Sequence, residues 1–262
     1  MHRALLLVSY GSADPAGQAD LAALEDVLAA SVPQLPVLRA VSSPAVRRRL
    51  AQAGQTVPSP AEAMAELADR GITELLVLPT HLVPGSDFAA LQADAAAAAP
   101  RFAALKIAQP LLADPAARAE LARLLVTRCP AGNALLLAGH GADGPAGQCY
   151  RALARDLQTA GGGRVLLGVL RGEPGFAPAL AALQTGGWRQ VVLQPLLLTA
   201  GTHARREISG PGPDSWAGQL QAAGLSVICK NRGLARDAGV QKLYLRRLQL
   251  LCRRPSANGG EL

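Results

Sequence analysis

The sequence contains few aromatic and few charged residues, and it has no long apolar run. Aromatic residues occupy 3% and charged residues 17% of its 262 positions, whereas half of the positions are hydrophobic. This composition excludes an intrinsically disordered chain, which would be richer in charge and poorer in apolar residues. No stretch reaches the roughly 20 apolar residues of a membrane helix, and the N-terminal run is too short for a signal peptide. We therefore expect a globular protein with no membrane partner.

Cysteines and nucleotide-binding loops are also scarce. The four cysteines are scattered, without a CxxC pair, which is typical of reduced thiols that pack inside a cytoplasmic protein. There is no Walker loop, no GxGxxG that follows a strand, and no serine nucleophile elbow. We therefore expect no nucleotide and no organic cofactor.

The net charge of +7 is carried mostly by arginine. It indicates either a solvated basic surface or an anionic partner. Nucleic acid is not expected, because no basic stripe alternates with aromatic residues and no nucleic-acid-binding motif is present. A small molecule with many carboxylates fits the charge equally well. Two arginine clusters, 47–49 and 205–206, could hold carboxylates by forked hydrogen bonds, although the first is more typical of a solvated helix face.

The most informative feature is an internal repeat. Residues 4–18 read ALLLVSYGSADPAGQ and residues 134–148 read ALLLAGHGADGPAGQ. Nine of these fifteen positions are identical at a constant offset of 130. The first copy has Tyr10 where the second has His140. A duplicated scaffold that differs at the tip of one strand can build a single asymmetric site.

A second pair of segments supports the duplication. Residues 74–87 read ELLVLPTHLVPGSD and align with residues 190–203, QVVLQPLLLTAGTH, at an offset of 116. Here Asp87 stands opposite His203. The second half again has a histidine where the first half has another residue.

Short apolar runs alternate with longer amphipathic segments along the whole chain. Several runs are apolar throughout, as expected for parallel strands that are covered on both faces. Their alternation with helices implies right-handed crossovers. We therefore predict an α/β fold of two similar halves, each an open parallel sheet flanked by helices, with a cleft between the halves. The N-terminal half is expected at residues 1–130, the C-terminal half at 131–252 and a polar tail at 253–262. The predicted strands are residues 5–9, 37–41, 74–79, 105–108, 135–139, 165–169, 191–194 and 225–229. The predicted helices include residues 19–30, 60–70, 115–127, 150–159, 216–223 and 238–252.

Three histidines follow predicted strands, at the edge where open α/β sheets bind ligands. His140 lies between two glycines, which permit a tight turn and a close approach of a ligand. His203 and His81 follow two other strands. Each alone could be a structural histidine, but His140 and His203 together favour a site that holds a divalent metal with open positions, or a general base.

Few carboxylates accompany these histidines. Glu173 follows the strand at 165–169, and Glu207 lies four residues after His203. Either could be a metal ligand or a partner of one, and a solvated surface carboxylate is an equally good interpretation of each. Tyr10 and Ser12 line the corresponding loop of the first half.

The ordered set of motifs resembles the class II tetrapyrrole chelatases, and within them the anaerobic-type sirohydrochlorin cobaltochelatase family. The resemblance covers nearly the whole chain. Its most specific stretch is QPLLLTAGTHARREISGPGPDSWAGQLQAAG, which accompanies LLLVSYGSADP, LLLAGHG and NRGLARDAGVQKLYLRRL.

The resemblance implies that Co²⁺, as the substrate metal, is inserted into sirohydrochlorin without nucleotide hydrolysis, a step of anaerobic cobalamin biosynthesis. The two motif histidines of the family match His140 and His203. The first would bind the metal and help to accept pyrrole protons, and the second would complete the metal site. The carboxylates of sirohydrochlorin would suit the positive charge. The residues then expected to contact the macrocycle are Tyr10, Ser12, His81, Gly85, Gly141 and Arg205.

One position departs from the family pattern. The family has a metal-binding glutamate in a Glu-x-Tyr-Pro segment, and alignment on Pro174 puts Arg171 at the glutamate position. Arginine is always protonated and cannot bind a metal. Either Glu173, two residues away, replaces the glutamate as the third ligand, or that ligand is lost. Insertion of Fe²⁺ or Ni²⁺, or binding of a tetrapyrrole or metal without insertion, therefore stays open, as does assembly into a homo-oligomer.

Overall fold

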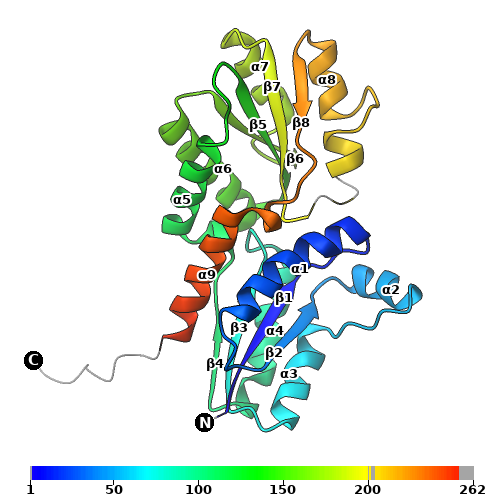
Figure 1. The fold of residues 1–262 in the computed structure, drawn as a ribbon, viewed down its shortest axis with the longest axis vertical. Coiled ribbons are helices and arrows are strands. Elements are labelled where there is room, and N and C mark those ends of the chain that lie inside the picture. Colours follow the sequence, from blue (N-terminus) through cyan, green and yellow to red (C-terminus); the bar gives the residue numbers. More distant parts are fainter. Residues whose placement is uncertain (1, 200, 202–203, 254–262) are drawn as a thin grey trace, which may run out of the picture.

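The computed structural model describes residues 2–199, 201 and 204–253 (Figure 1). Two four-stranded parallel sheets form its centre, with strand orders β2-β1-β3-β4 and β6-β5-β7-β8. The order is the same in both sheets, so the predicted duplication and the predicted α/β fold are confirmed. The predicted polar tail lies outside the described residues, apart from Arg253.

The first sheet and its connections occupy the first part of the chain. Their elements are β1 (Arg3–Ser9), α1 (Pro15–Ala30), β2 (Val37–Val41), α2 (Pro44–Gln52), α3 (Pro60–Asp69), β3 (Glu74–Pro79), α4 (Ser86–Ala98), η1 (Ala99–Arg101), β4 (Ala104–Ile107), η2 (Leu111–Ala113) and α5 (Pro115–Val126).

The second sheet repeats the arrangement. Its elements are β5 (Ala134–Gly141), α6 (Gly144–Gly161), β6 (Val165–Arg171), α7 (Phe176–Thr185), β7 (Gln190–Leu196), η3 (Ala204–Ile208), α8 (Trp216–Ala222), β8 (Ser226–Cys229), η4 (Leu234–Arg236) and α9 (Ala238–Cys252).

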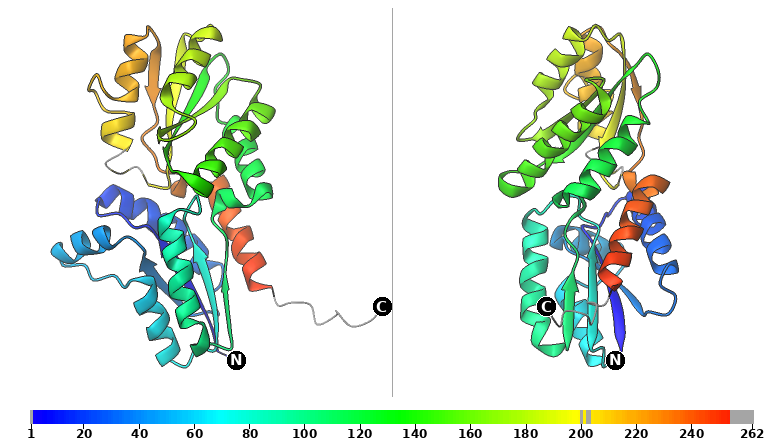
Figure 2. Two further views of the ribbon diagram at one scale, coloured as in Figure 1. Left: turned by 180° about the vertical axis from the view of Figure 1, so that it is seen from behind. Right: turned by 90° about the vertical axis from the view of Figure 1, so that its left-hand side faces the viewer.

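The central strands are apolar because helices cover both faces of each sheet. Along β1, Leu5 and Leu7 face one apolar cluster with α1 and α9, whereas Leu6 and Val8 face another with α3 and α4. Figure 2 shows the first sheet between these two helix layers. This two-sided burial explains why the strands read as continuous apolar runs without alternation.

Two helices begin earlier than the sequence pattern predicts. The helix expected at 19–30 begins at Pro15, and the helix expected at 150–159 begins at Gly144. In the first, the Asp14 carboxylate accepts hydrogen bonds from the backbone N–H groups of residues 16 and 17. A proline at the first helical position and an aspartate before it form a start signal, which the apolar periodicity alone misses.

The last helix of each half packs against the other half. α5 leaves the first sheet and packs against α6, to which the Arg118–Asp156 ion pair (2.7 Å) connects it. α9 leaves the second sheet and packs against α1 and β3, where the Tyr244 hydroxyl donates to the carbonyl of Thr80. A single apolar cluster therefore runs through both sheets.

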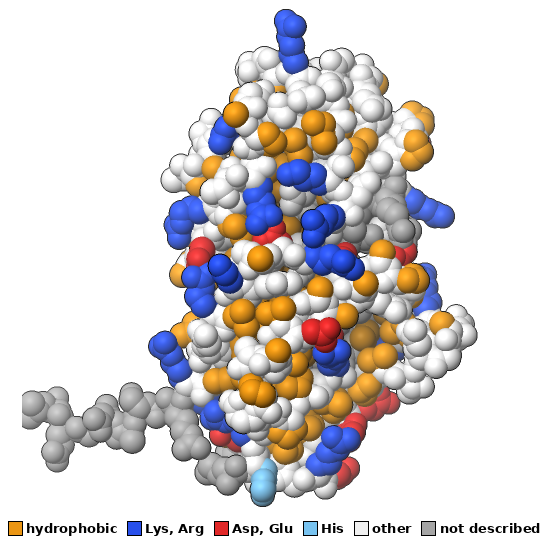
Figure 3. Space-filling view, in the orientation of Figure 1, with side chains coloured by type: hydrophobic (Ala, Val, Ile, Leu, Met, Phe, Trp, Pro, Cys, Tyr) orange, Lys and Arg blue, Asp and Glu red, His pale blue; other side chains and the backbone are white. Residues whose placement is uncertain are grey.

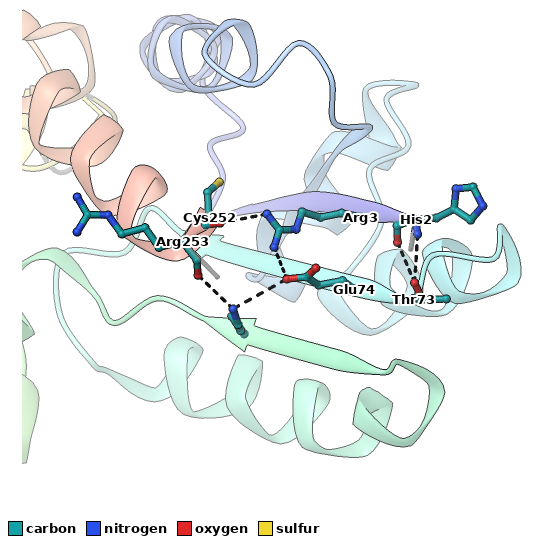
Figure 4. A network of polar contacts seen from close by, with 7 residues as sticks. His2, Arg3, Thr73, Glu74, Cys252 and Arg253 are labelled. Atoms are coloured by element: carbon teal, nitrogen blue, oxygen red, sulfur yellow. Dashed lines mark hydrogen bonds and ion pairs between the residues drawn. The ribbon is translucent and has the colours of Figure 1, made fainter. Parts of the chain in front are cut away.

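The end of α9 is bound to the amino edge of the first sheet (Figure 4). Arg3 donates to the Cys252 carbonyl (3.1 Å) and pairs with Glu74 (2.5 Å). Lys106 on β4 lies 3.9 Å from the same carboxylate and donates to the Arg253 carbonyl. The exchanged helix is thus held at its far end by polar contacts as well as by apolar packing.

Candidate functional site

In each sheet, the order in which the chain adds strands reverses between the two central strands. The chain passes from the first strand to one neighbour and then crosses to the other, so the loops after β1 and β3, and after β5 and β7, flank this point. Ligands of open α/β sheets bind beside such points, at the carboxyl ends of the strands. The predicted site residues of the described chain follow these strands or their direct neighbours.

His140 lies near the carboxyl end of β5 and is half-buried. Its Nδ1 atom lies 3.2 Å from the carbonyl oxygen of Gly141. Because a carbonyl oxygen can only accept, Nδ1 carries the proton in this contact and Nε2 holds the lone pair. Gly141 has a φ of +83°, and a Cβ atom there would lie 1.8 Å from the carbonyl oxygen of Arg171. Only glycine permits this close pairing of β5 with β6.

Tyr150 on α6 packs against this strand end, and the sequence analysis did not identify it. Its ring fills the space next to Gly139, where a Cβ atom would lie 2.9 Å from Tyr150 Cε1. Burial raises the pKa of Tyr150 to about 12, although a hydrogen bond with the Gly141 backbone opposes the shift. A tyrosine inside an amphipathic helix carries no signal of this role, because its contact with β5 arises only in the folded chain.

Arg171 is the last residue of β6 and Glu173 lies in the loop that follows, and both are exposed. The Glu173 carboxylate accepts a hydrogen bond from the Gly175 N–H (3.2 Å). The same loop approaches the one that follows His140, since a Cβ atom on Gly172 would lie 3.7 Å from a carboxylate oxygen of Asp143. The two loops are therefore neighbours.

His203 lies outside the described residues, as does the side chain of Arg205. The backbone of Arg205 belongs to η3, a π-helical turn that also contains Glu207. Within the described part of the chain, no three His, Cys, Asp or Glu side chains are grouped closely enough to hold a metal ion. The expected metal set of His140, His203 and Glu173 thus stays a prediction.

In the first half, Tyr10 and Ser12 follow β1. The Tyr10 side chain is 53% exposed at the position equivalent to His140. The Ser12 hydroxyl instead belongs to the turn that begins α1, where it accepts from the Asp14 N–H (3.2 Å). Tyr10 is therefore available to a ligand, whereas Ser12 has a partner within its own loop.

His81 and Gly85 lie in the loop after β3. The Nε2 atom of His81 lies 3.0 Å from the Ser42 hydroxyl, a contact that spans the carboxyl end of β1. Its Nδ1 atom is buried without a hydrogen-bond partner among the described residues. Burial lowers the pKa of His81, and the carboxylate of Asp87 opposes the shift. Gly85 caps α4 through its backbone, with open space around its Cα.

The loops of the two halves meet beside α1. A Cβ atom on Gly17 would lie 3.5 Å from the Cβ atom of Thr199, in the loop that leads from β7 toward His203. Close by, Arg236 pairs with Asp20 on α1 (2.6 Å). The loop after β1 is thus adjacent to the loop after β7, so both halves contribute to the same region.

The described helices include none that is long and apolar enough to cross a bilayer. All four cysteines are free. Burial raises the pKa of each thiol, which disfavours the reactive thiolate.

Solved structures share this fold. SirB from Bacillus subtilis with Fe³⁺ superposes with a TM-score of 0.67 at 18% identity, covering 96% of both chains. The sirohydrochlorin chelatase SirB from Bacillus subtilis subspecies spizizenii in complex with cobalt has a TM-score of 0.66 at 17% identity, covering 96% of this chain and 95% of the other. The fold is therefore that of the class II chelatases.

The sequence identifies the family within that class. Residues 3–252 match the cobalt chelatase (CbiK) family. The sirohydrochlorin cobaltochelatase CbiKC of Nitratidesulfovibrio vulgaris is 32% identical over 93% of this chain and 88% of its own length. The sirohydrochlorin cobaltochelatase of Salmonella typhimurium is 27% identical over 95% and 96%. The chain belongs to the cobalt chelatase (CbiK) family, which confirms the resemblance seen in the sequence.

Proposed function

We propose that this chain inserts Co²⁺ into sirohydrochlorin and that its C-terminal half, residues 131–252, carries the metal chemistry. The observation that carries the proposal is the position of His140, which ends a central strand at the winding reversal of a chain in the cobalt chelatase family. Two relatives named sirohydrochlorin cobaltochelatase support the choice of metal and macrocycle.

Insertion requires the loss of two pyrrole N–H protons and a stepwise exchange of metal ligands. A neutral imidazole can accept a proton or bind a metal through its lone pair. The contact between His140 Nδ1 and the Gly141 carbonyl puts the proton of the neutral ring on Nδ1 and the lone pair on Nε2. Tyr150 and the two glycines hold the strand end, so His140 is presented without rearrangement of the backbone.

We assign His203 and Glu173 as the further metal ligands and Tyr10, His81 and Arg205 to the macrocycle. Glu173 is an exposed carboxylate in a loop next to that of His140. Insertion is proposed to need no nucleotide, because the sequence has no Walker loop. The free cysteines support a cytoplasmic location.

The test is cobalt insertion into sirohydrochlorin, followed by absorbance, with wild type and His140→Ala. General acid–base groups contribute about 10²- to 10⁴-fold, so we expect the variant to be at least about 100-fold slower. Tyr10→Ala, at the equivalent position of the other half, is the matched control and should mainly raise KM. Glu173→Ala should raise the Co²⁺ concentration at half-maximal rate, and unchanged kinetics would exclude Glu173 as a ligand.

A second candidate is a carrier that binds the macrocycle or metal without insertion. The observation in its favour is Arg171, which occupies the position of the family glutamate and cannot bind a metal. If wild type binds sirohydrochlorin but inserts Co²⁺ no faster than the uncatalysed reaction, the carrier function replaces the chelatase function.

A further inference from the structure

Each half contains one segment that leads from its last strand to the exchanged helix. In the first half, the backbone N–H of Ala108 donates to the carbonyl of Val77 (3.0 Å). In the second half, the backbone N–H of Lys230 donates to the carbonyl of Leu193 (2.9 Å). Asp114 and Asp237 then cap α5 and α9 in the same way. Residues 108–114 and 230–237 are therefore equivalent segments of the duplicated fold.

The two segments differ in charge: the first contains no basic residue, whereas the second is rich in them. The first reads AQPLLAD and the second KNRGLARD. Lys230 replaces Ala108, and two arginines, Arg232 and Arg236, are added in the second segment. Because the first half makes the equivalent backbone hydrogen bonds without these cations, in a segment one residue shorter, the fold itself does not require them.

A cavity lies beside each segment, and the two cavities also differ. The first has a volume of about 330 Å³. Its cation, Arg247, pairs with Asp114 (3.2 Å) and donates to the carbonyl of Gln109. Apolar residues Leu250 and Leu251 complete the lining. The charges of the first cavity are thus balanced within the protein.

The second cavity is about twice as large, with a volume of about 670 Å³, and it is basic. Arg128 pairs with Asp237, and Arg236 pairs with Asp20. Lys230 and Arg232 have no carboxylate partner among the described residues. The cavity is lined by Arg128, Gln194, Cys229, Lys230, Asn231, Arg232, Gly233, Leu234, Arg236, Asp237 and Ala238.

A buried amide faces the same cavity. Gln194 on β7 is only 6% exposed, and its equivalent in β3 is the fully buried Leu78. The Gln194 side chain lines the second cavity. Its amide atoms are not among the buried polar atoms of the described residues that lack a partner, so the amide reaches the cavity. This polar substitution of an apolar core position offers hydrogen-bonding groups to a ligand there.

Figure 3 shows the face of the molecule that carries the start of α9 and the end of β8. Lysine and arginine side chains gather across the middle of this face, over the start of α9 and the end of β8. The cavity lining contains four basic side chains and one carboxylate, which leaves a surplus of three positive charges, or two when Asp20 is counted. This surplus matches an anion with two or three negative charges.

We propose that this cavity binds a small multivalent anion, a phosphate or a carboxylate compound, at a site separate from the chelatase site. Lys230 and Arg232 supply the charge. The amides of Gln194 and Asn231 donate hydrogen bonds to the anion oxygens. None of the expected metal or macrocycle residues whose side chains the structure describes lines this cavity, so the proposal does not rest on the proposed chelatase function.

The test is calorimetric titration of the full chain with inorganic phosphate and, separately, with citrate, each at low ionic strength. Binding of only one of them would assign the site to phosphate or to carboxylate compounds. A charged hydrogen bond is worth about 1.5–3 kcal/mol, so Lys230→Gln and Arg232→Gln should each raise Kd about tenfold or more. Gln194→Leu, which installs the residue of the first half, should also weaken binding while the net charge stays the same.

Arg189→Gln is the matched control, because Arg189 is an exposed cation just before β7, at the opposite end of that strand from the cavity. It should leave Kd unchanged. The proposal is wrong if neither anion binds at millimolar concentration, or if Arg189→Gln weakens binding as much as Lys230→Gln does. Cobalt insertion measured on Lys230→Gln should stay close to wild type, and a loss of insertion there would instead place the cavity within the chelatase site.

Discussion

The two halves of this chain share a strand order and differ where their polar residues lie. At the end of the central strand, Tyr10 in the first half corresponds to His140 in the second. In the next strand, Leu78 corresponds to Gln194, and beyond the last strand Ala108 corresponds to Lys230. These differences fall at strand ends and in one cavity, where they leave the sheet pairing intact. One half of a duplicated scaffold can therefore carry functional polar residues, while the other half keeps only the residues that its fold requires.

The first half also contains a polar residue that the second half lacks. His81 lies in the first half, and its equivalent in the second is Leu197. Both residues lie in loops that are bound to the next helical turn in the same way: Leu111 donates to the carbonyl of His81, and Leu234 donates to that of Leu197. The histidine is thus a feature of the first half that the shared backbone does not explain.

The largest expected effect on stability comes from substituting the equivalent glycines Gly11 and Gly141. Gly11 and Gly141 both have positive φ, but a Cβ atom on Gly11 would meet a methyl group of Val41, whereas one on Gly141 would meet a backbone carbonyl. A methyl group can rotate away and a paired carbonyl cannot. We expect Gly11→Ala to lower the free energy of unfolding by about 2 kcal/mol and Gly141→Ala by about 2 kcal/mol more. Urea unfolding measures both, and equal losses would show that the β5–β6 pairing is less rigid than the structure indicates.

A smaller effect is expected in the helix exchange. Arg247 on α9 is 7% exposed and bonds to residues before α5, whereas its neighbour Arg246 forms an exposed pair with Glu120. Arg247→Ala should cost about 3 kcal/mol, because it removes the packing of a buried side chain and its hydrogen bonds to Asp114 and Gln109. Arg246→Ala should cost at most about 1 kcal/mol. Thermal or urea unfolding would decide, and similar values for the two would mean that apolar packing alone holds α9 in place.

The smallest effect is a change in the pH dependence of stability. Burial lowers the pKa of His81 in the folded protein, whereas an unfolded histidine has a pKa of about 6.5. As the pH falls below that value, His81 binds a proton in the unfolded chain but not in the folded chain. The free energy of unfolding therefore decreases. His81→Leu, the residue of the second half, should reduce the slope of unfolding free energy against pH below about 6.5. His2→Leu is the control at an exposed terminal histidine, and a slope that is unchanged in His81→Leu would contradict the assignment.

Much of the fold was predictable because its signals are local. The predicted strands agree with the observed ones to within two residues at each end, since their apolar runs are continuous. His140 was identified because a glycine-flanked histidine after such a run is visible in the sequence. Tyr150 was not identified, since its contact with Gly139 depends on how α6 lies on β5.

The sequence by itself determined the two repeated halves, their parallel sheets and the histidine at the strand end, because apolar runs, glycines and caps act over a few residues. Only the tertiary structure decided that α5 and α9 exchange partners and that one apolar core joins both sheets. It also decided that Arg128, Gln194 and Lys230, which are far apart in the chain, line one basic cavity. The physical reason is that burial and charge at these positions depend on long-range packing, which no local pattern contains.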